Sequence, residues 1–319
     1  MTENNADTQQ PMKQFSAADV YQRLTPKKAR EALERALQGS FDPKDDATRL
    51  GIDAAGGQLL AMPSAVGEWA GCKLASVAPG NPDKGLPMIQ GTYVLFDAAT
   101  LTPSATVEGA SLTAIRTPAV SALAADYLAP QKVKQLVVFG TGTQALHHVH
   151  AMLEIRDIPV IKMVGRSADL VEDAVATLRE QGVEAQAGTA ADVRDADLIC
   201  CCTSAKEPLF AAEDLKPGAC VAAMGTHTPE AREIPGAAFS RQGFASDPVV
   251  VVESVHTALE EAGDVLLAIS EGHMDKDRLG TLKQLVNGEV TRSDSAPNIF
   301  KSTGMSWEDV VAAAAVVED

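Results

Sequence analysis

A short glycine-rich stretch carries the most specific chemical signal in the chain. Residues 140–145 read Gly-Thr-Gly-Thr-Gln-Ala and directly follow an apolar run at 134–139. Gly140 permits a tight turn, Gly142 lets the backbone approach a pyrophosphate, and the small Ala145 lets a helix pack closely against a strand. The helix that follows would direct free N–H groups at the anion. We therefore predict a dinucleotide site rather than an ordinary glycine turn. Its expected contacts are Gly140, Gly142, Thr143, Gln144 and Ala145.

The end of the next strand bears on the choice between NAD and NADP. A carboxylate there would accept a hydrogen bond from the ribose 2′-hydroxyl. Instead the run at 160–164 continues into Gly165, Arg166 and Ser167. Arg166 can pair with a 2′-phosphate and Ser167 can donate to it, whereas the simpler interpretation is a solvated surface arginine. We predict that NADP(H) is preferred and that NAD(H) remains possible. The ends of later strands add two further expected cofactor contacts, Thr203 and Met224.

Three basic residues stand out in a chain with a formal net charge of −16. Arg49, Lys73 and Arg116 all lie in its strand-rich first half, and Lys73 sits within an apolar run. A buried cation needs a partner. One candidate partner is the carboxylate of a substrate, and the other is an internal acid such as Glu108.

The elements that must position these residues are of two kinds. Short apolar runs separated by Gly and Pro turns predict an antiparallel meander between residues 49 and 108. Its strands are expected at 58–62, 71–77, 91–96 and 104–108. Two capped helices precede it, beginning after Ser16 and Thr25. A helix at 119–128 is apolar nearly all round, so we expect it to be buried between two domains.

Strands and helices alternate from residue 134 onward, which predicts a parallel sheet covered by helices. Its strands are expected at 134–139, 160–164, 197–202, 219–224 and from 243. A last helix at 307–317 should return to the first domain. The predicted fold class is α/β: a Rossmann doubly wound parallel sheet, plus a strand-rich α+β domain for substrate binding and dimerisation. We place the Rossmann domain at 118–296, and the other domain at 1–117 together with 297–319.

Composition excludes several classes of function. The negative charge disfavours binding to nucleic acid and to anionic membranes. No run reaches the ~20 apolar residues that span a bilayer. The first fourteen residues are polar and expected to be disordered, and no apolar leader is visible. We therefore expect a cytoplasmic protein, whose consecutive Cys200, Cys201 and Cys202 are buried free thiols.

No spacing typical of a metal site is present. His147, His148 and His150 crowd one predicted helix, but separations of one and three residues do not bring all three to one face. We expect them at the edge of the cofactor site or on the surface, and no bound metal.

Seen together, several motifs resemble the ornithine cyclodeaminase/μ-crystallin family from about Arg49 to Val310. The matching segments are Met62-Pro63, Gly71-Cys72-Lys73, Gly85-Leu86-Pro87, Leu112 to Thr117, Gly140 to Ala145, Gly225 with Pro229 and Arg232-Glu233, and Phe300 to Gly304. The resemblance implies a homodimer whose strand-rich domain binds the substrate and forms the subunit contact. It also implies that Arg49, Lys73 and Arg116 hold the substrate carboxylate, and that Thr117 contacts the cofactor.

One departure from the family pattern is informative. The resemblance implies that ornithine cyclodeaminases carry an aspartate in a Gly-x-Asp-x-Pro stretch. This aspartate would activate the substrate amine and the attacking water. Here the stretch reads Gly-Thr-His-Thr-Pro over 225–229, with His227 in the aspartate's place. A histidine can move protons but supplies no fixed negative charge for the ammonium of ornithine. Reductase or dehydrogenase chemistry is therefore favoured over cyclodeamination.

The sequence thus predicts an NAD(P)H-dependent oxidoreductase for small amino or imino acids. Our leading hypothesis is reduction of a cyclic ketimine, such as Δ1-pyrroline-2-carboxylate, to proline. His227 is the candidate proton donor, and solvent or Lys73 could serve instead. The alternatives are an ornithine cyclodeaminase, an alanine dehydrogenase, and a non-catalytic NADPH-binding protein of the crystallin type.

Overall fold

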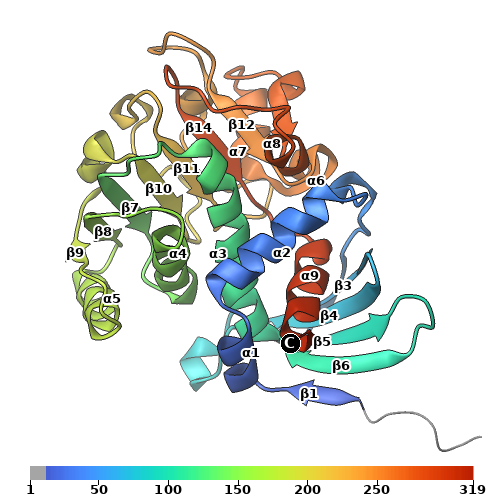
Figure 1. The fold of residues 1–319 in the computed structure, drawn as a ribbon. Helices are drawn as coiled ribbons and strands as arrows, with labels where there is room; N and C mark the ends of the chain where they lie inside the picture. Colours follow the sequence, from blue (N-terminus) through green and yellow to red (C-terminus); the bar gives the residue numbers. More distant parts are fainter. Residues whose placement is uncertain (1–11, 319) are drawn as a thin grey trace, which may run out of the picture.

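The computed structural model describes residues 12–318 and contains two sheets (Figure 1). The smaller has six strands in the order β1-β6-β5-β4-β3-β2, and all neighbours are antiparallel except β1 and β6. Its four long strands confirm the predicted meander. Residues 13 and 14, expected to be disordered, pair in β1, whereas residues 1–11 lie outside the described part. The strands are β1 (Lys13–Phe15), β2 (Leu50–Ala54), β3 (Gly57–Val66), β4 (Trp69–Val77), β5 (Ile89–Asp97) and β6 (Pro103–Glu108).

The larger sheet has eight strands, all parallel, in the order β13-β12-β14-β11-β10-β7-β8-β9. The chain runs outward from β7 through β8 to β9, then returns to continue on the other side with β10. This reversal is where doubly wound sheets bind their ligands. The strands are β7 (Gln135–Phe139), β8 (Val160–Val164), β9 (Gln186–Ala187), β10 (Leu198–Cys201), β11 (Cys220–Ala223), β12 (Val249–Val252), β13 (Leu279–Thr281) and β14 (Asn298–Lys301).

Helices cover the sheets and connect them. α1 and α2 begin at the predicted caps, because the side chains of Ser16 and Thr25 accept hydrogen bonds from N–H groups of the first turn. α9 lies on the six-stranded sheet, as the sequence predicted for the last helix. The helices are α1 (Ala17–Arg23), α2 (Pro26–Gln38), α3 (Gly109–Leu128), α4 (Thr143–Leu153), α5 (Ala168–Glu180), α6 (Val255–Glu261), α7 (Gly263–Ser270), α8 (Leu282–Val286) and α9 (Ser306–Val317).

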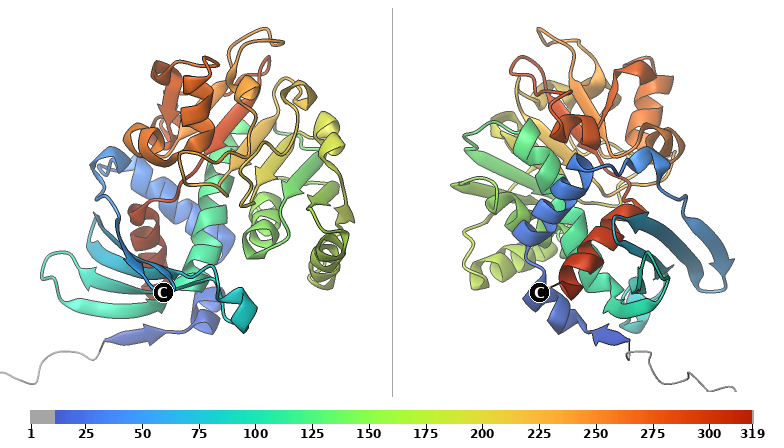
Figure 2. Two further views of the ribbon diagram at one scale, coloured as in Figure 1. Left: turned by 180° about the vertical axis from the view of Figure 1, so that it is seen from behind. Right: turned by 45° about the vertical axis from the view of Figure 1, so that its right-hand side comes forward.

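Helix α3 ties the two halves together. It is buried along most of its length and contacts β5 of one sheet and β11 and β14 of the other (Figures 1 and 2). It begins ten residues before the predicted start, because the side chain of Glu108 caps it by accepting hydrogen bonds from the N–H groups of Ala110 and Ser111. Arg116 and Thr117 consequently lie inside this helix and not before it.

Two predictions for the parallel sheet need correction. Residues 243–245 form a turn, and the strand expected from residue 243 is β12, which begins six residues later at Val249. β14 was not predicted as a strand, yet it is hydrogen-bonded between β11 and β12. The proposed boundary at residue 297 would assign it to the wrong sheet. The strands that pair with β14 lie far from it in the sequence, so no local pattern indicates the pairing.

Two of the three consecutive cysteines are buried as predicted, whereas Cys202 is only partly buried. Cys200 and Cys201 are buried on β10 and belong to hydrophobic clusters on opposite faces of the sheet. All five cysteines of the chain are free thiols. None of the helices within residues 12–318 has an apolar stretch long enough to cross a membrane.

Candidate active site

Five loops leave the eight-stranded sheet at the carboxyl ends of β7, β10, β11, β12 and β14. Parallel strands place these ends along one edge, where open α/β sheets bind ligands. The loops carry Gly140, Thr203, His227, Glu253 and the segment 302–304. This edge therefore holds the predicted dinucleotide turn together with several polar and charged groups.

The glycine turn has the geometry that its sequence predicts. Gly140 has φ +118°, and a Cβ there would lie 2.6 Å from the carbonyl oxygen of Cys202. Gly142 precedes α4, and a Cβ there would meet nothing within 4 Å. No side chain caps α4, so its first N–H groups have no capping partner among the described residues. Ala145 is buried and packs close to Gly140. These features fit the pyrophosphate of a dinucleotide.

Gln144 connects this turn to helix α3. Its side-chain N–H donates to the carbonyl oxygen of Thr113 over 3.3 Å. Its Oε1 is buried and has no hydrogen-bond partner within residues 12–318. A buried acceptor of this kind calls for a donor from outside the described chain.

Arg166 and Ser167 follow β8 at the outer side of the same edge. Arg166 is exposed, and its side chain forms no ion pair with any described residue. Ser167 Oγ accepts a hydrogen bond from the N–H of Leu170 and thereby caps α5. The structure brings both residues to the expected end of β8, and their contact with a 2′-phosphate stays a prediction.

Thr203 and Met224 follow β10 and β11, as expected for cofactor contacts. The backbone N–H and hydroxyl of Thr203 both donate to Glu233, at 2.7 and 2.8 Å. Glu233 also accepts the N–H of Gly225 at 2.8 Å. Burial raises the pKa of Glu233, and Lys301 works against that rise. The buried carboxylate therefore holds two neighbouring loops of this edge in place.

His227 stands in a loop that a buried ion pair supports. Lys301 Nζ lies 2.9 Å from Asp264 Oδ2 and donates to the carbonyl oxygen of Thr226 at 2.6 Å. The side chain of His227 is itself exposed, but the protein around it, followed by the charges of Arg49 and Lys301, lowers the pKa of the imidazole. His227 is therefore neutral near neutral pH, which makes it a weaker acid than the sequence suggested.

Lys73 and Arg116 lie side by side on a shared carboxylate. Lys73 Nζ is 2.7 Å from Asp309 Oδ2, and Arg116 Nε donates to Asp309 Oδ1 at 3.1 Å. Arg116 Nη1 donates to Glu308 at 2.5 Å. The sequence left two possible partners for these cations, a substrate carboxylate or an internal acid such as Glu108. The structure contains an internal acid, but Glu108 caps α3 instead. Asp309 and Glu308 on α9 take that role.

The two cations respond differently to burial. Burial lowers the pKa of Lys73 to about 8, even though Asp309 opposes the shift. Burial also works against the charge of Arg116, but Asp309 and Glu308 outweigh it, so the pKa of Arg116 is raised. Lys73 is thus charged at neutral pH but can release a proton, whereas Arg116 is permanently charged.

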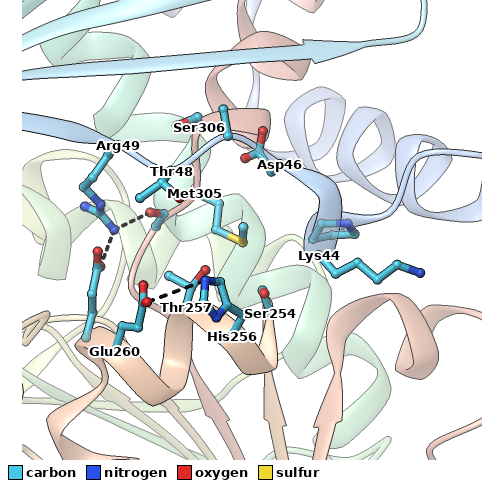
Figure 3. Close-up of a pocket in the computed structure, with 14 residues that line it drawn as sticks. Lys44, Asp46, Thr48, Arg49, Ser254, His256, Thr257, Glu260, Met305 and Ser306 are labelled. Carbon is cyan, nitrogen blue, oxygen red and sulfur yellow. Dashed lines mark hydrogen bonds and ion pairs between the residues drawn. The ribbon is translucent and has the colours of Figure 1, made fainter.

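Arg49 completes what we call the cation cluster: Arg49, Lys73 and Arg116. Its guanidinium points from the loop before β2 toward α6, where Nη2 lies 2.6 Å from Glu261 Oε2 (Figure 3). The same nitrogen donates to the carbonyl oxygen of Gly304 at 3.0 Å. A Cβ at Gly304 would lie 2.9 Å from Arg116 Nη1. Gly304 therefore contacts Arg49 through its carbonyl oxygen and packs closely against Arg116. The structure thereby brings all three residues of the cation cluster together, as the sequence predicted.

Thr113 places this cluster beside the cofactor turn. Its hydroxyl lies 3.4 Å from Lys73 Nζ, and its carbonyl oxygen accepts the hydrogen bond from Gln144. Thr117, one helical turn later, is buried on α3, and its contact with a cofactor stays a prediction. A small molecule held by the cluster would consequently lie within reach of a dinucleotide at Gly142.

The histidines of α4 have separate partners. His148 is buried between Ser121 and the carbonyl oxygen of Gln144, and burial lowers its pKa to about 4. His147 stacks on Tyr21, and His150 contacts Gln181. Placing His148 at the cofactor edge or the surface was wrong. No group of His, Cys, Asp and Glu suited to a metal ion occurs in the described residues.

Sequence reasoning missed the acids of this site. Glu308 and Asp309 lie in a buried helix whose sequence resembles that of any helix with acidic residues in its first turn. Glu253 directly follows the apolar run of β12, which is the one signal that could have marked it. Its carboxylate accepts hydrogen bonds from Ser302 Oγ at 2.6 Å and from Thr303 N at 2.9 Å.

Comparison with known proteins gives consistent matches over almost the whole chain. A sequence model of the ornithine cyclodeaminase/mu-crystallin family matches residues 12–319. The Δ1-pyrroline-2-carboxylate reductase of Colwellia psychrerythraea is 31% identical over 318 residues, covering 96% of this chain and 99% of that protein. The residues that the family model matches include the glycine turn, the cation cluster and α9.

Solved structures match both sheets at once. The Δ1-pyrroline-2-carboxylate reductase of Thermococcus litoralis, in complex with NADH and L-proline, superimposes with a TM-score of 0.87 and 26% identity. The match covers 96% of this chain and 97% of that one. An archaeal alanine dehydrogenase dimer with bound NAD also has a TM-score of 0.87, at 25% identity, with 96% and 95% of the chains covered. The complete arrangement of the two sheets is therefore shared with proteins that bind a nicotinamide cofactor.

Proposed function

Because the chain belongs to the ornithine cyclodeaminase/mu-crystallin family, we propose that it is a nicotinamide-dependent reductase of small cyclic imino acids. The best substrate is Δ1-pyrroline-2-carboxylate, reduced to proline. One observation carries this proposal: Thr113 contacts both Lys73 of the cation cluster and Gln144 of the dinucleotide turn. A carboxylate held by the cluster would therefore set the adjacent imine carbon against the cofactor.

The residues of the cation cluster have different roles in the proposed reaction. Arg116 and Arg49 hold the substrate carboxylate and so fix the position of the imine carbon. A nicotinamide, when bound, supplies the hydride that this carbon accepts. The C=N π bond breaks and the nitrogen gains a proton. Lys73 is our preferred donor, because its pKa of about 8 keeps it protonated at neutral pH yet able to release the proton. His227 is the alternative, and its lowered pKa makes it the weaker one.

His227 also favours reduction over cyclodeamination. Asp264 and Glu233, the acids beneath its loop, are buried and already bonded to backbone N–H groups. Neither is free to supply the fixed charge that the ammonium group of ornithine would need. An alanine dehydrogenase stays a second candidate, because a solved structure of that activity matches this fold so well.

We further propose that NADP(H) is preferred to NAD(H). Arg166 is exposed with no ion-pair partner among the described residues, and Ser167 lies beside it. An unpaired guanidinium at the end of β8 suits a 2′-phosphate. The proteins of the matching structures bind NADH or NAD, so this preference rests on Arg166 alone.

The chain is proposed to act as a homodimer through the six-stranded sheet, with the Rossmann and strand-rich parts as separate domains. Large apolar side chains are exposed on β2 and on the strands beside it, with Leu50 at 66% and Ile52 at 63%. Patches of this kind mark contact surfaces. A cytoplasmic location also stays a prediction, which the free thiols support.

The proposal is tested by following oxidation of NADPH and NADH with cyclic imines, and with 2-oxo acids plus amines. We expect the fastest turnover with Δ1-pyrroline-2-carboxylate. Release of ammonia from ornithine without net NADH formation would instead establish a cyclodeaminase. Reduction of NAD with alanine would establish a dehydrogenase. Tight NADPH binding without turnover of any of these compounds would favour the non-catalytic binding protein.

A further inference from the structure

Glu308 and Glu253 are two buried acidic side chains that interact with each other. Glu308 is fully buried and Glu253 is 2% exposed. Burial raises the pKa of Glu308, and so do the charge of Glu253 and a hydrogen bond between the two carboxyl groups. Two carboxylates cannot form that bond unless one of them carries a proton, because an ionised carboxylate only accepts.

The surrounding contacts decide which of the two carries it. Glu253 accepts from Ser302 Oγ and from the N–H groups of Thr303 and Gly304, so both of its oxygens already face donors. Glu308 accepts only from Arg116, through Oε2. Its Oε1 is buried and receives no hydrogen bond from any donor within residues 12–318. That oxygen is the place for the proton, and Glu253 is the carboxylate that receives it.

We propose that Glu308 is a neutral positioning residue, which holds Arg116 through one oxygen and donates its proton to Glu253 through the other. Asp309 is then the acid that pairs with both Lys73 and Arg116, so with Glu308 neutral these two cations keep one net positive charge. A substrate carboxylate needs that charge. This last step rests on the proposed function, whereas the shared proton does not.

The bridge also joins the two halves of the molecule. Glu253 follows β12 of the parallel sheet, whereas Glu308 lies on α9, which packs on the six-stranded sheet. Because Glu253 organises the segment 302–304 at the cofactor edge, the proton links that segment to the residue expected to bind substrate. The charged groups that face the pair are Arg116 from α3, Lys73 from β4, Asp309 from α9, and Glu261 with its partner Arg49.

Glu308→Gln tests the proton directly. The amide keeps a donor for Glu253 and an acceptor for Arg116 but cannot ionise at any pH. Infrared difference spectra of the whole protein near neutral pH should show that a carboxylic-acid C=O band of the wild type is lost in this variant. Glu172→Gln, an exposed change on α5, is the matched control and should lose no such band. If Glu308→Gln also lost none, the wild-type residue would be ionised and the proposal overturned.

L-proline binding tests the effect on charge. In the wild type, affinity should fall as the pH rises through and beyond about 8, because Lys73 loses its proton there and ionisation of Glu308 would remove further positive charge. In Glu308→Gln the fall should be smaller by about threefold or more, with only the Lys73 part remaining. An equal fall in both proteins would contradict the positioning role. If Glu308→Gln does not fold, loss of the wild-type infrared band on raising the pH still tests the proton.

These measurements separate this inference from the proposed function. A wild type that shows the infrared band but neither binds L-proline nor reduces any imine would retain the shared proton and lose the proposed function. A wild type that reduces imines but shows no band lost in Glu308→Gln would keep its function and lose the inference.

Discussion

The glycine turn after β7 and the cation cluster both prepare the protein for an anion, but they use different atoms. The turn offers backbone N–H groups and open space in front of Gly142, without any charged side chain. The cluster offers charged side chains, each already paired with an acid of the same chain. Backbone N–H groups at an open turn cost little free energy when no ligand is bound, whereas buried charges are costly unless they are always paired. A binding site made of buried cations must therefore carry its own acids.

The largest effect is expected from removing a buried cation. Lys73→Ala should reduce turnover by about 10²-fold or more, because the imine nitrogen loses its preferred proton donor. Cofactor affinity should stay nearly unchanged, since the glycine turn does not use this side chain. Steady-state kinetics and NADPH titration measure the two quantities. Lys73→Arg should restore only part of the activity, because a guanidinium directs its hydrogen bonds differently.

A different result for Lys73→Ala would contradict a role for Lys73 in turnover. A variant that kept most of its activity but unfolded at a lower temperature would show that Lys73 serves Asp309 as a structural partner. The cation cluster would then lose its central member, and the contrast between the two regions would disappear.

The glycine turn should respond in the opposite way. Gly142→Ala should leave the fold intact, since its Cβ meets no atom, but should raise the Kd for NADPH about tenfold or more by standing in front of the pyrophosphate. Gly140→Ala is the matched comparison and should lower thermal stability, because of its positive φ and the contact with Cys202. Unchanged NADPH affinity in Gly142→Ala would place the cofactor elsewhere.

A smaller effect is expected where the cofactor site uses a side chain. Arg166→Asp replaces attraction for a 2′-phosphate by repulsion, so the preference for NADPH over NADH should shift roughly tenfold. The ratio of the two Kd values measures it. Equal weakening of both cofactors would show that Arg166 does not recognise the phosphate.

The smallest effect concerns pH. Activity should fall as the pH rises through about 8, where Lys73 loses its proton. Between about 8 and the ordinary value of 10.5, the unfolded chain binds more protons at Lys73 than the folded one, so the Lys73 contribution to stability rises with pH. Activity and stability should thus move in opposite directions over this window. A profile in Lys73→Arg identical to the wild type would assign the titration to another group.

Local patterns in the sequence were sufficient for much of the fold and for the cofactor turn. The caps at Ser16 and Thr25, the meander, and the strand–turn–helix around Gly140 depend on residues only a few positions apart. The sequence also marked Arg49, Lys73 and Arg116 as cations needing partners, because charges in apolar surroundings are conspicuous in an acidic chain.

Tertiary structure alone decided what those partners are. Arg116 and Asp309 lie 193 positions apart, and β14 joins β11 and β12 from the far end of the chain. Glu308 and Asp309 have no local feature that separates them from surface acids, and Glu253 has only its place after the apolar run of β12. Their chemistry arises from burial and from the charges packed against them, and these exist only once α9 lies on the six-stranded sheet beside α3.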